Sequence, residues 1–359
     1  MNKLIPILMV EAGFYEKNND GSVSCRLCPH ECRIGHGEAG LCNVRYNMKG
    51  VLESRTYGRP VALSADPIEK KPFFHFLPGS KSYSIATRGC NLKCLFCQNA
   101  DISQEGGGDS IVPQVPAGKV AENALNSGCM SIAYTYTEPT VFLEYALDVI
   151  NAARKYHLRN VFVTNGYTSS AALDEIVGVL DAANVDLKSF SDETYRRVCG
   201  GRLEPVLNSI RRYRDAGVWV EVTTLIVPGM NDSREELAEI AGFIADLGVD
   251  IPWHVSRFRP DYKMRDGKPT PLSKLGEAVE LGRDAGLKYI YAGNASGEVV
   301  EDTLCPACGK TVIDRESFHV LNNSMREGAC GDCGDKTDGV FELIIMKAYA
   351  YSDGGARGN

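Results

Sequence analysis

The sequence predicts an α/β fold in which a parallel sheet lies between two small cysteine-rich modules. Between residues 81 and 300, short β-branched or aromatic runs alternate with segments of helical periodicity, as is typical of βαβ units. All thirteen cysteines except Cys129 and Cys199 fall into three groups with metal-ligand spacing. We therefore expect a cysteine-rich module and linker at 1–80, the α/β domain at 81–300, a metal-stabilised β module at 301–351 and a tail at 352–359.

The individual elements follow from periodicity and turn signals. The expected strands span 82–87, 131–136, 160–164, 184–188, 218–227, 253–258 and 288–292. The expected helices span 117–126, 141–156, 171–180, 205–216, 234–246 and 272–285. About six such repeats fit either a doubly wound sheet or a barrel, and the pattern alone does not decide between them.

Composition and charge narrow the class of protein. With 44% hydrophobic and 24% charged residues, the chain has the composition of an ordinary globular protein. Its net charge of −7 argues against a general nucleic-acid binder. The apolar run at residues 4–10 is too short to cross a membrane, and no later run approaches the roughly eighteen apolar residues that a span needs. We expect a cytoplasmic protein whose thiols stay reduced and bind metal.

The central motif is the run RGCNLKCLFCQN at residues 88–99, in which Cys90, Cys94 and Cys97 have the spacing C-x3-C-x2-C. Thiolates are soft ligands that suit zinc, copper(I) and iron–sulfur clusters. Three cysteines would leave one iron of a four-iron cluster open to a substrate or cofactor. A zinc site would need a fourth ligand nearby, and no Cys or His follows before Cys129. We therefore favour a cluster over a zinc knuckle.

Each terminal module contains a set of four cysteines. The N-terminal set suits either structural zinc or an auxiliary iron–sulfur cluster, and its spacing does not separate them; it comprises Cys25, Cys28, Cys32 and Cys42. His30 and His36 nearby are interpreted as solvated loop histidines. The C-terminal set forms paired CxxC knuckles typical of a zinc ribbon, with a rubredoxin-like iron site as the alternative; it comprises Cys305, Cys308, Cys330 and Cys333. A hairpin at 311–320 and a closing strand at 340–351 would complete this module.

Polar residues follow several of the predicted strands. In parallel barrels the catalytic groups come from the carboxyl ends of the strands. The residues at these positions are Glu138, Thr164, Asn165, Asp186 and Lys188, and His254 lies within a later strand. Asp186 and Lys188 are two residues apart, so both side chains can point to the same face. We expect these side chains to meet at one rim.

The cysteine motif, with Phe96 before its third cysteine, resembles the signature of the radical S-adenosylmethionine (radical SAM) superfamily. The longer run GCNLKCLFCQNADIS is most similar to the activators of pyruvate formate-lyase, and the whole chain resembles the AmmeMemoRadiSam system radical SAM enzymes. The resemblance implies an open, partial (β/α)6 barrel, a [4Fe-4S] cluster whose open iron chelates SAM, and one-electron cleavage of SAM to a 5′-deoxyadenosyl radical. It also implies an external electron donor of the flavodoxin or ferredoxin type.

The resemblance further implies roles for the rim residues. Glu138 corresponds to the GGE motif that binds the SAM amino group, although Tyr136 and Thr137 stand where the motif has glycines. The pair Thr164 and Asn165 resembles the TNG of the activator branch, but Val163 replaces its usual acidic residue, which puts a cation site in doubt. The remaining implied SAM contacts are Asp186 and Lys188 of a DxK motif, His254, and Phe96 near the adenine.

The substrate is the least determined feature. Resemblance to activators suggests a partner protein whose glycyl hydrogen is abstracted, whereas a small molecule or a peptide fits nearly as well. A different class of function is a non-catalytic multi-zinc scaffold, which the three-cysteine loop and the rim residues oppose. We interpret residues 66–80 as an extended segment that packs Phe73, Phe74 and Phe76 on the core rather than as a lid. Cys129 is expected to lie in the core. For Cys199 a substrate-facing thiol is the alternative, but we favour a buried or incidental one because nothing indicates an activated thiolate.

Overall fold

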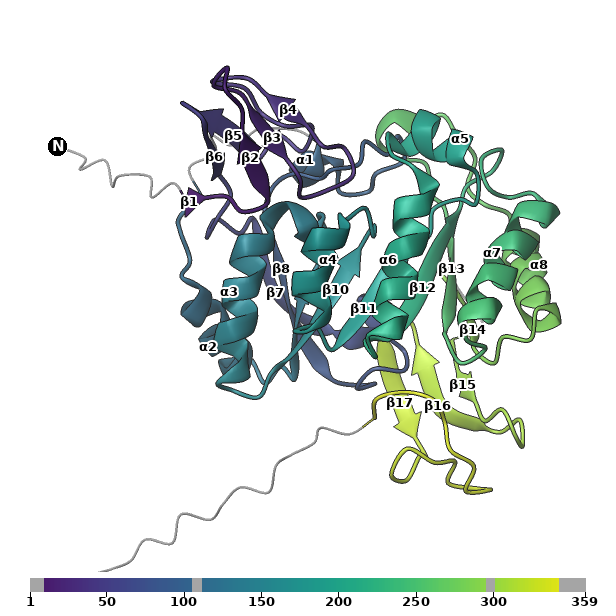
Figure 1. Cartoon of the computed structure of the whole chain (residues 1–359). Helices are drawn as coiled ribbons and strands as arrows, with labels where there is room; N and C mark the ends of the chain where they lie inside the picture. The colour runs from purple at the N-terminus through teal and green to yellow at the C-terminus, as the bar shows by residue number, and fades with distance from the viewer. Residues whose placement is uncertain (1–9, 105–111, 295–300, 342–359) are drawn as a thin grey trace, which may run out of the picture.

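The centre of the computed structural model, which describes residues 10–104, 112–294 and 301–341, is one curved sheet (Figure 1). Its strand order is β14-β13-β12-β11-β10-β9-β8-β7. Strands β8 to β14 pair in parallel and in sequence order, while β7 adds an antiparallel edge. Their bounds are β7 Ala62–Pro67, β8 Lys81–Ala86, β9 Ser131–Tyr134, β10 Arg159–Thr164, β11 Ala182–Asp186, β12 Trp219–Ile226, β13 Trp253–Arg257 and β14 Ile290–Gly293.

The helices that connect the parallel strands all cover the outer face of this sheet (Figure 1). Parallel strands in sequence order, joined by crossovers of one hand, place every helix on the same side and curl the sheet around its other face. The two edges β14 and β7 do not pair in the described part of the chain, so the barrel is open. This confirms the predicted partial barrel. The main helices are α2 Ala117–Asn126, α3 Leu143–Arg154, α4 Ser170–Val177, α6 Leu203–Asp215, α7 Arg234–Leu247 and α8 Leu272–Asp284.

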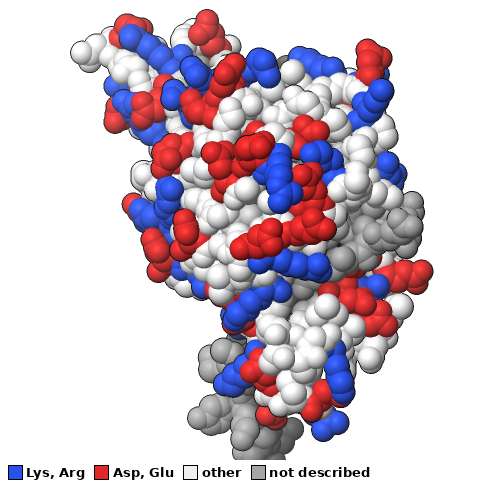
Figure 2. Space-filling model, turned by 90° about the vertical axis from the view of Figure 1, so that its right-hand side faces the viewer, with Lys and Arg blue, Asp and Glu red and all other residues white. Residues whose placement is uncertain are grey.

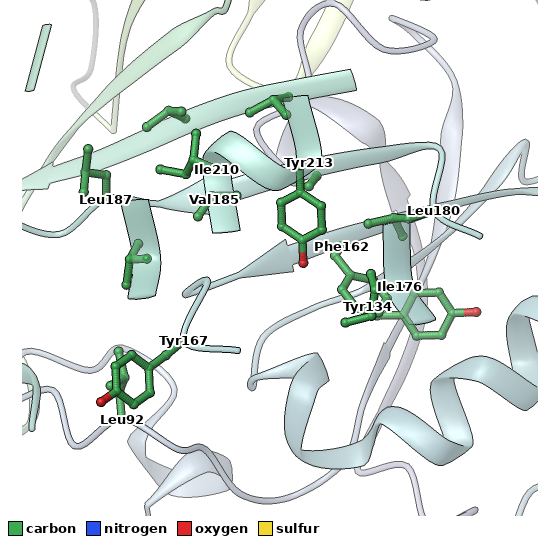
Figure 3. Close-up of a cluster of buried hydrophobic side chains, with 14 of the residues drawn as sticks. Leu92, Tyr134, Phe162, Tyr167, Ile176, Leu180, Val185, Leu187, Ile210 and Tyr213 are labelled. Carbon is green, nitrogen blue, oxygen red and sulfur yellow. The ribbon is translucent and has the colours of Figure 1, made fainter. Parts of the chain in front are cut away.

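The layer between helices and sheet is a continuous apolar core. Figure 3 shows one part of it, where Tyr134 and Phe162 from neighbouring strands lie edge to face with ring centroids 5.2 Å apart. Ile176 of α4 and Ile210 of α6 point into the same layer (Figure 3). Burial of these side chains anchors each helix and therefore fixes where each strand ends.

The inner face of the sheet is filled by the segment that follows β7. Phe73 and Phe76 are 0% and 1% exposed and pack on the strands through Ala133, Val161 and Ala182. The two alanines leave the room that the phenyl rings occupy. The segment thus packs on the core, as the sequence predicts, although residues 62–67 form an edge strand where we expected a linker.

The N-terminal module consists of two three-stranded antiparallel sheets. Residue Arg45, 1% exposed, ties it to the barrel through an ion pair with Glu144 of α3. Glu144 also accepts a hydrogen bond from the Gly13 amide, at 2.8 Å. The strands are β1 Val10–Glu11, β2 Tyr15–Lys17, β3 Val23–Cys25, β4 Arg33–Ile34, β5 Arg45–Met48 and β6 Val51–Ser54.

The C-terminal module is a three-stranded antiparallel sheet of β15 Thr303–Leu304, β16 Thr311–Glu316 and β17 His319–Asn323. Strands β16 and β17 form the predicted hairpin. Buried polar contacts join the module to the barrel: Arg315 donates to the Phe74 carbonyl at 2.8 Å, and His75 contacts the Asp338 carbonyl at 2.6 Å. Of the predicted closing strand at 340–351, residues 342–351 lie outside the described residues, as does the tail.

Charged side chains of both signs are interspersed on the face shown in Figure 2, rather than gathered by sign. This arrangement agrees with the modest net charge of −7 and does not resemble the basic footprint of a nucleic-acid binder. None of the helices in the described ranges is both long and apolar enough to cross a bilayer.

The inner-face segment should contribute strongly to stability. We expect Phe73→Ala to lower the free energy of unfolding by about 3–5 kcal/mol, because it empties a fully buried ring site. Phe318→Ala, at a residue that is 48% exposed, should change it by no more than about 0.5 kcal/mol. Anaerobic denaturant titrations of both variants make the comparison, and equal losses would contradict the packing role of the segment.

Candidate functional site

A cavity of about 620 Å³ opens at the carboxyl ends of the parallel strands. Its volume falls in the range of sites that enclose a cofactor-sized ligand. The structure brings together in its lining every residue that the sequence predicts for the central cluster and for SAM. These are Cys90, Cys94, Cys97, Phe96, Glu138, Thr164, Asn165, Asp186, Lys188 and His254.

The three cysteines project from the loop between β8 and α1 (Ala100–Ser103). Backbone hydrogen bonds to a neighbouring turn hold this loop: the Lys93 amide donates to the Cys199 carbonyl at 2.7 Å and the Leu95 amide to Val198 at 3.1 Å. The Cys90 sulfur also accepts a hydrogen bond from the Leu92 amide, at 3.4 Å. Such donors stabilise the charge of a metal-bound thiolate.

The spacing of these sulfurs separates a cluster from a single ion. In the described ranges, the one set of three or more Cys, His, Asp or Glu ligand atoms that all lie within 4.8 Å of one another is the C-terminal cysteine set. Cys90, Cys94 and Cys97 are therefore spread more widely than the ligands of one zinc ion. A wide set of three thiols on a cavity wall fits an iron–sulfur cluster with one open iron.

Burial governs the protonation of these thiols. It raises the pKa of Cys90, and the nearby Glu138 and Cys94 act in the same direction. The pKa of Cys94 is raised by a hydrogen bond with the buried Cys199 thiol and by burial. A metal or cluster that bound here would therefore have to displace protons from these thiols. Cys199 is buried in the main core, as expected, and its carbonyl also accepts a hydrogen bond from the three-cysteine loop, a contact that no sequence signal indicated.

Glu138 is a buried carboxylate at the centre of the rim, 2% exposed. One oxygen accepts hydrogen bonds from the Thr164 hydroxyl at 2.8 Å and from both the amide and the hydroxyl of Thr140, and the other accepts the Asn165 amide at 2.8 Å. Burial raises the pKa of Glu138 despite these donors. Glu138 thus ties the end of β9 to the end of β10 and positions Thr164 and Asn165.

Asn165 and Lys188 bring polar groups close to the cluster loop. The Asn165 side-chain nitrogen lies 3.6 Å from the Cys90 sulfur. The Lys188 ammonium pairs with Asp186 at 2.8 Å. Burial lowers the pKa of Lys188, but Asp186 and the thiol of Cys94 outweigh it, so the net shift is upward. The amine stays charged beside the ligand loop.

The side chain of His254 is oriented by the buried carboxylate of Glu221. Its Nε2 lies 2.6 Å from a carboxylate oxygen of Glu221, which is itself fully buried. Burial raises the pKa of Glu221, but the hydrogen bond and charge of His254 outweigh it and lower the pKa overall. His254 lines the cavity but uses this nitrogen inside the protein, so its predicted contact with SAM stays a prediction.

A buried polar network behind the cavity wall was not predicted from the sequence. Lys71, fully buried, donates to Asp66 at 3.0 Å and to the Tyr136 hydroxyl at 2.8 Å, which fixes Tyr136 at the cavity wall with a left-handed φ of 66°. The Tyr136 carbonyl in turn accepts from Asn99 at 2.9 Å. A signal existed in the consecutive lysines before the aromatic segment, but their partners are distant in sequence.

The chain is similar to several known proteins. The family model of the Radical SAM superfamily matches residues 84–244. An uncharacterized protein of Methanocaldococcus jannaschii is 43% identical over 336 residues, 93% of this chain and 100% of that protein. The pyruvate formate-lyase 1-activating enzyme of Escherichia coli K12 is 24% identical over 208 residues, 54% of this chain and 84% of that enzyme. A solved domain of a pyruvate-formate lyase-activating enzyme from Bacteroides vulgatus aligns with 46% of this chain and 99% of its own, with 18% identity and a TM-score of 0.40.

The open barrel places a thiol-lined cavity at the carboxyl ends of its parallel strands, where enzymes built on parallel barrels bind their ligands. The chain belongs to the radical SAM superfamily, in the branch that includes the pyruvate formate-lyase activating enzymes. Membership implies a [4Fe-4S] cluster and SAM as cofactors. The three widely spaced thiols and the cofactor-sized cavity fit both groups.

The hydrogen bonds to Glu138 provide a test of the site. Glu138→Gln keeps the side-chain size but turns an amide N–H2 toward donors such as Thr164 and Asn165. We expect the free energy of unfolding to fall by about 1–3 kcal/mol, because a buried donor loses its acceptor. Glu122→Gln, at a half-exposed residue of α2, should change it by no more than about 0.5 kcal/mol. Matched losses in denaturant titrations would contradict the positioning role of Glu138.

Proposed function

We propose that this protein is a radical SAM enzyme that abstracts a hydrogen atom from a glycyl residue of a partner protein. The observation that carries the proposal is the convergence of the cysteine loop and the rim residues on one cavity. One-electron reductive cleavage of SAM, and with it a radical able to take a hydrogen atom, is the chemistry that the cluster supplies when bound. An external one-electron donor of the flavodoxin or ferredoxin type, in a reducing cytoplasm, would complete the reaction.

The protein's own residues would bind the cluster, orient the cofactors and shield the site from water. Cys90, Cys94 and Cys97 would hold the cluster. The ion pair of Lys188 with Asp186 places fixed charges beside it, and Glu138 keeps the β10 end in a single geometry. Phe96, 4% exposed, adds an apolar wall. Fixed polar groups in a site shielded from bulk water need no rearrangement during the reaction.

Two observations support a protein substrate. The relatives at 24% and 23% identity are named as activating enzymes of pyruvate formate-lyase. In addition, the cavity extends from the cysteine loop to residues of the C-terminal module, where Glu301, Ser317 and Phe318 line it. A peptide loop of a partner bound in the cavity would therefore also contact the C-terminal module. A small-molecule substrate is the competing outcome.

Deuterium transfer tests this proposal. Reconstituted protein with SAM and dithionite should form 5′-deoxyadenosine, and a peptide deuterated at the glycine α-carbon should transfer deuterium into it. Cys94→Ala should abolish product, whereas Cys129→Ala, which removes a thiol outside the ligand sets, should retain it. If the 5′-deoxyadenosine formed with the peptide carries no deuterium, a glycyl substrate is excluded, but reductive cleavage of SAM is still supported.

We also propose that the C-terminal cysteines bind zinc. Their sulfurs lie 3.6 Å apart for Cys305 and Cys333 and 3.8 Å apart for Cys308 and Cys330. Zinc–sulfur bonds of about 2.3 Å in a tetrahedron give sulfur separations of about 3.8 Å. The apolar cluster of this module is small, so metal would supply much of its stability.

Removal of one C-terminal ligand should release this ion. We expect Cys333→Ser to lower the zinc content by about one ion per chain and to lower the melting temperature of the protein, with the Cys129→Ala variant unchanged. Metal analysis and thermal unfolding measure both effects. Loss of iron instead of zinc would identify a rubredoxin-like site and contradict the zinc assignment.

A further inference from the structure

The four cysteines of the N-terminal module surround a small cavity of their own. They come from β3 and from the loops on either side of β4, and together they line a cavity distinct from the one at the strand ends; they are Cys25, Cys28, Cys32 and Cys42. The wall is completed by apolar side chains such as Leu27 and Ile34 and by three polar residues, namely His30 together with Arg45 and Asn91, the last two both 1% exposed. Such a shell shields a bound group from water.

The spacing of these sulfurs differs from that of the C-terminal set. All four C-terminal sulfurs lie within 4.8 Å of one another, and no three of the N-terminal sulfurs satisfy that limit within the described ranges. The N-terminal set resembles the Cys90, Cys94 and Cys97 set in this respect. Four thiolates spread around a cavity, rather than gathered on a point, suit a fully ligated iron–sulfur cluster better than one zinc ion.

A buried cation faces this cavity. Arg45 lies with one terminal nitrogen 3.8 Å from the Cys25 sulfur, and its Nε has no hydrogen-bond partner among the described residues. Its ion pair with Glu144 uses another nitrogen of the guanidinium. A buried N–H without a partner is costly unless a bound group accepts it. The anionic sulfur atoms of a cluster would supply that acceptor.

The N-terminal cysteines lie directly against the loop that carries the SAM-cluster ligands. His30 Nε2 lies 2.8 Å from the Asn91 carbonyl, next to Cys90 in the chain. The Asn91 side chain accepts from Asn165 at 2.9 Å, and the same Asn165 nitrogen lies 3.6 Å from the Cys90 sulfur. A continuous path of bonds and hydrogen bonds therefore leads from the N-terminal set to Cys90.

Gly89 shows how close the two loops are. A Cβ at this position would lie 2.8 Å from the Cys42 carbonyl oxygen and 2.5 Å from a Val44 methyl group. Its φ of 96° is also in the region that favours glycine. Glycine is therefore required here, and its small size lets the two cysteine loops touch.

We propose that Cys25, Cys28, Cys32 and Cys42 bind a second [4Fe-4S] cluster that relays single electrons to the cluster at Cys90, Cys94 and Cys97. A protein donor of the flavodoxin or ferredoxin class loses one electron, and the N-terminal cluster goes from the 2+ to the 1+ state. It returns to 2+ as the SAM-binding cluster gains that electron, with no bond made or broken. The relay, but not the binding of the second cluster, rests on the proposed function.

Metal content tests the second cluster. Wild-type protein reconstituted with iron and sulfide should contain about eight iron atoms and about one zinc per chain. The triple variant Cys90→Ala, Cys94→Ala, Cys97→Ala should keep about four iron atoms and, after reduction, an electron paramagnetic resonance (EPR) signal that SAM does not change. About four iron atoms and two zinc ions in the wild type, with a colourless triple variant, would overturn the assignment.

The EPR signals also distinguish failure of the proposed radical SAM function from failure of the second-cluster assignment. If the radical SAM assignment fails, no wild-type signal responds to SAM, while the SAM-insensitive signal of the N-terminal set persists. Cys28→Ser should lose that signal and retain the SAM-sensitive one, and Cys129→Ala should retain both. Because the wild-type metal count needs no substitution, misfolding of a variant does not affect the conclusion.

The choice of reductant tests the relay. With reduced flavodoxin, Cys28→Ser should form 5′-deoxyadenosine at least about tenfold more slowly than wild type, whereas with dithionite, a small reductant that needs no relay, its rate should stay within about twofold. In wild-type samples frozen soon after mixing with flavodoxin, the SAM-insensitive EPR signal should precede the SAM-sensitive one. Equal rates with flavodoxin, or the reverse order of signals, would overturn the relay.

Discussion

The arrangement of thiols around the strand-end cavity is the constraint on which the rest of the structure depends. Cys90, Cys94 and Cys97 are buried or half-buried and are spread more widely than the C-terminal set, an arrangement that suits a larger inorganic group better than a single ion. Two neighbouring parts of the chain pack against the loop that carries these cysteines. The turn ending at Cys199 supports it from one side, and Gly89 lets the N-terminal module pack against the other.

The charged side chains inside the protein each have a specific partner. The buried carboxylate of Glu138 is held by hydrogen bonds from neighbouring strand ends, and the partly buried amine of Lys188 is held by Asp186. Arg45 plays the corresponding part at the N-terminal cysteines, with Glu144 of the barrel as its counter-ion. Each buried charge is paired or hydrogen-bonded, as burial in a low-dielectric interior requires. The pairs also join separate elements, so electrostatics and architecture are linked.

Much of the fold was predictable because βαβ units carry their signal locally. Helix α2 spans 117–126 as predicted, and the other helices and parallel strands agree within a few residues. The edge strand β7 was not predicted, since its pairing with β8 depends on a partner rather than on its own pattern. The rim residues were found because strand ends in a barrel converge. The partners of Glu138, Cys199 and Lys71 were not, because hydrogen bonds between distant segments leave no periodic trace.

We propose that a cluster at the three-cysteine loop has one iron free to bind SAM. The most direct measurement is pulsed electron–nuclear double resonance on the singly reduced protein with SAM isotopically labelled at its amino nitrogen and carboxylate. We expect hyperfine coupling from both labels to the cluster, absent when Cys94 is replaced by alanine. An intact cluster without coupling from either label, or with a fourth protein ligand on that iron, would contradict it.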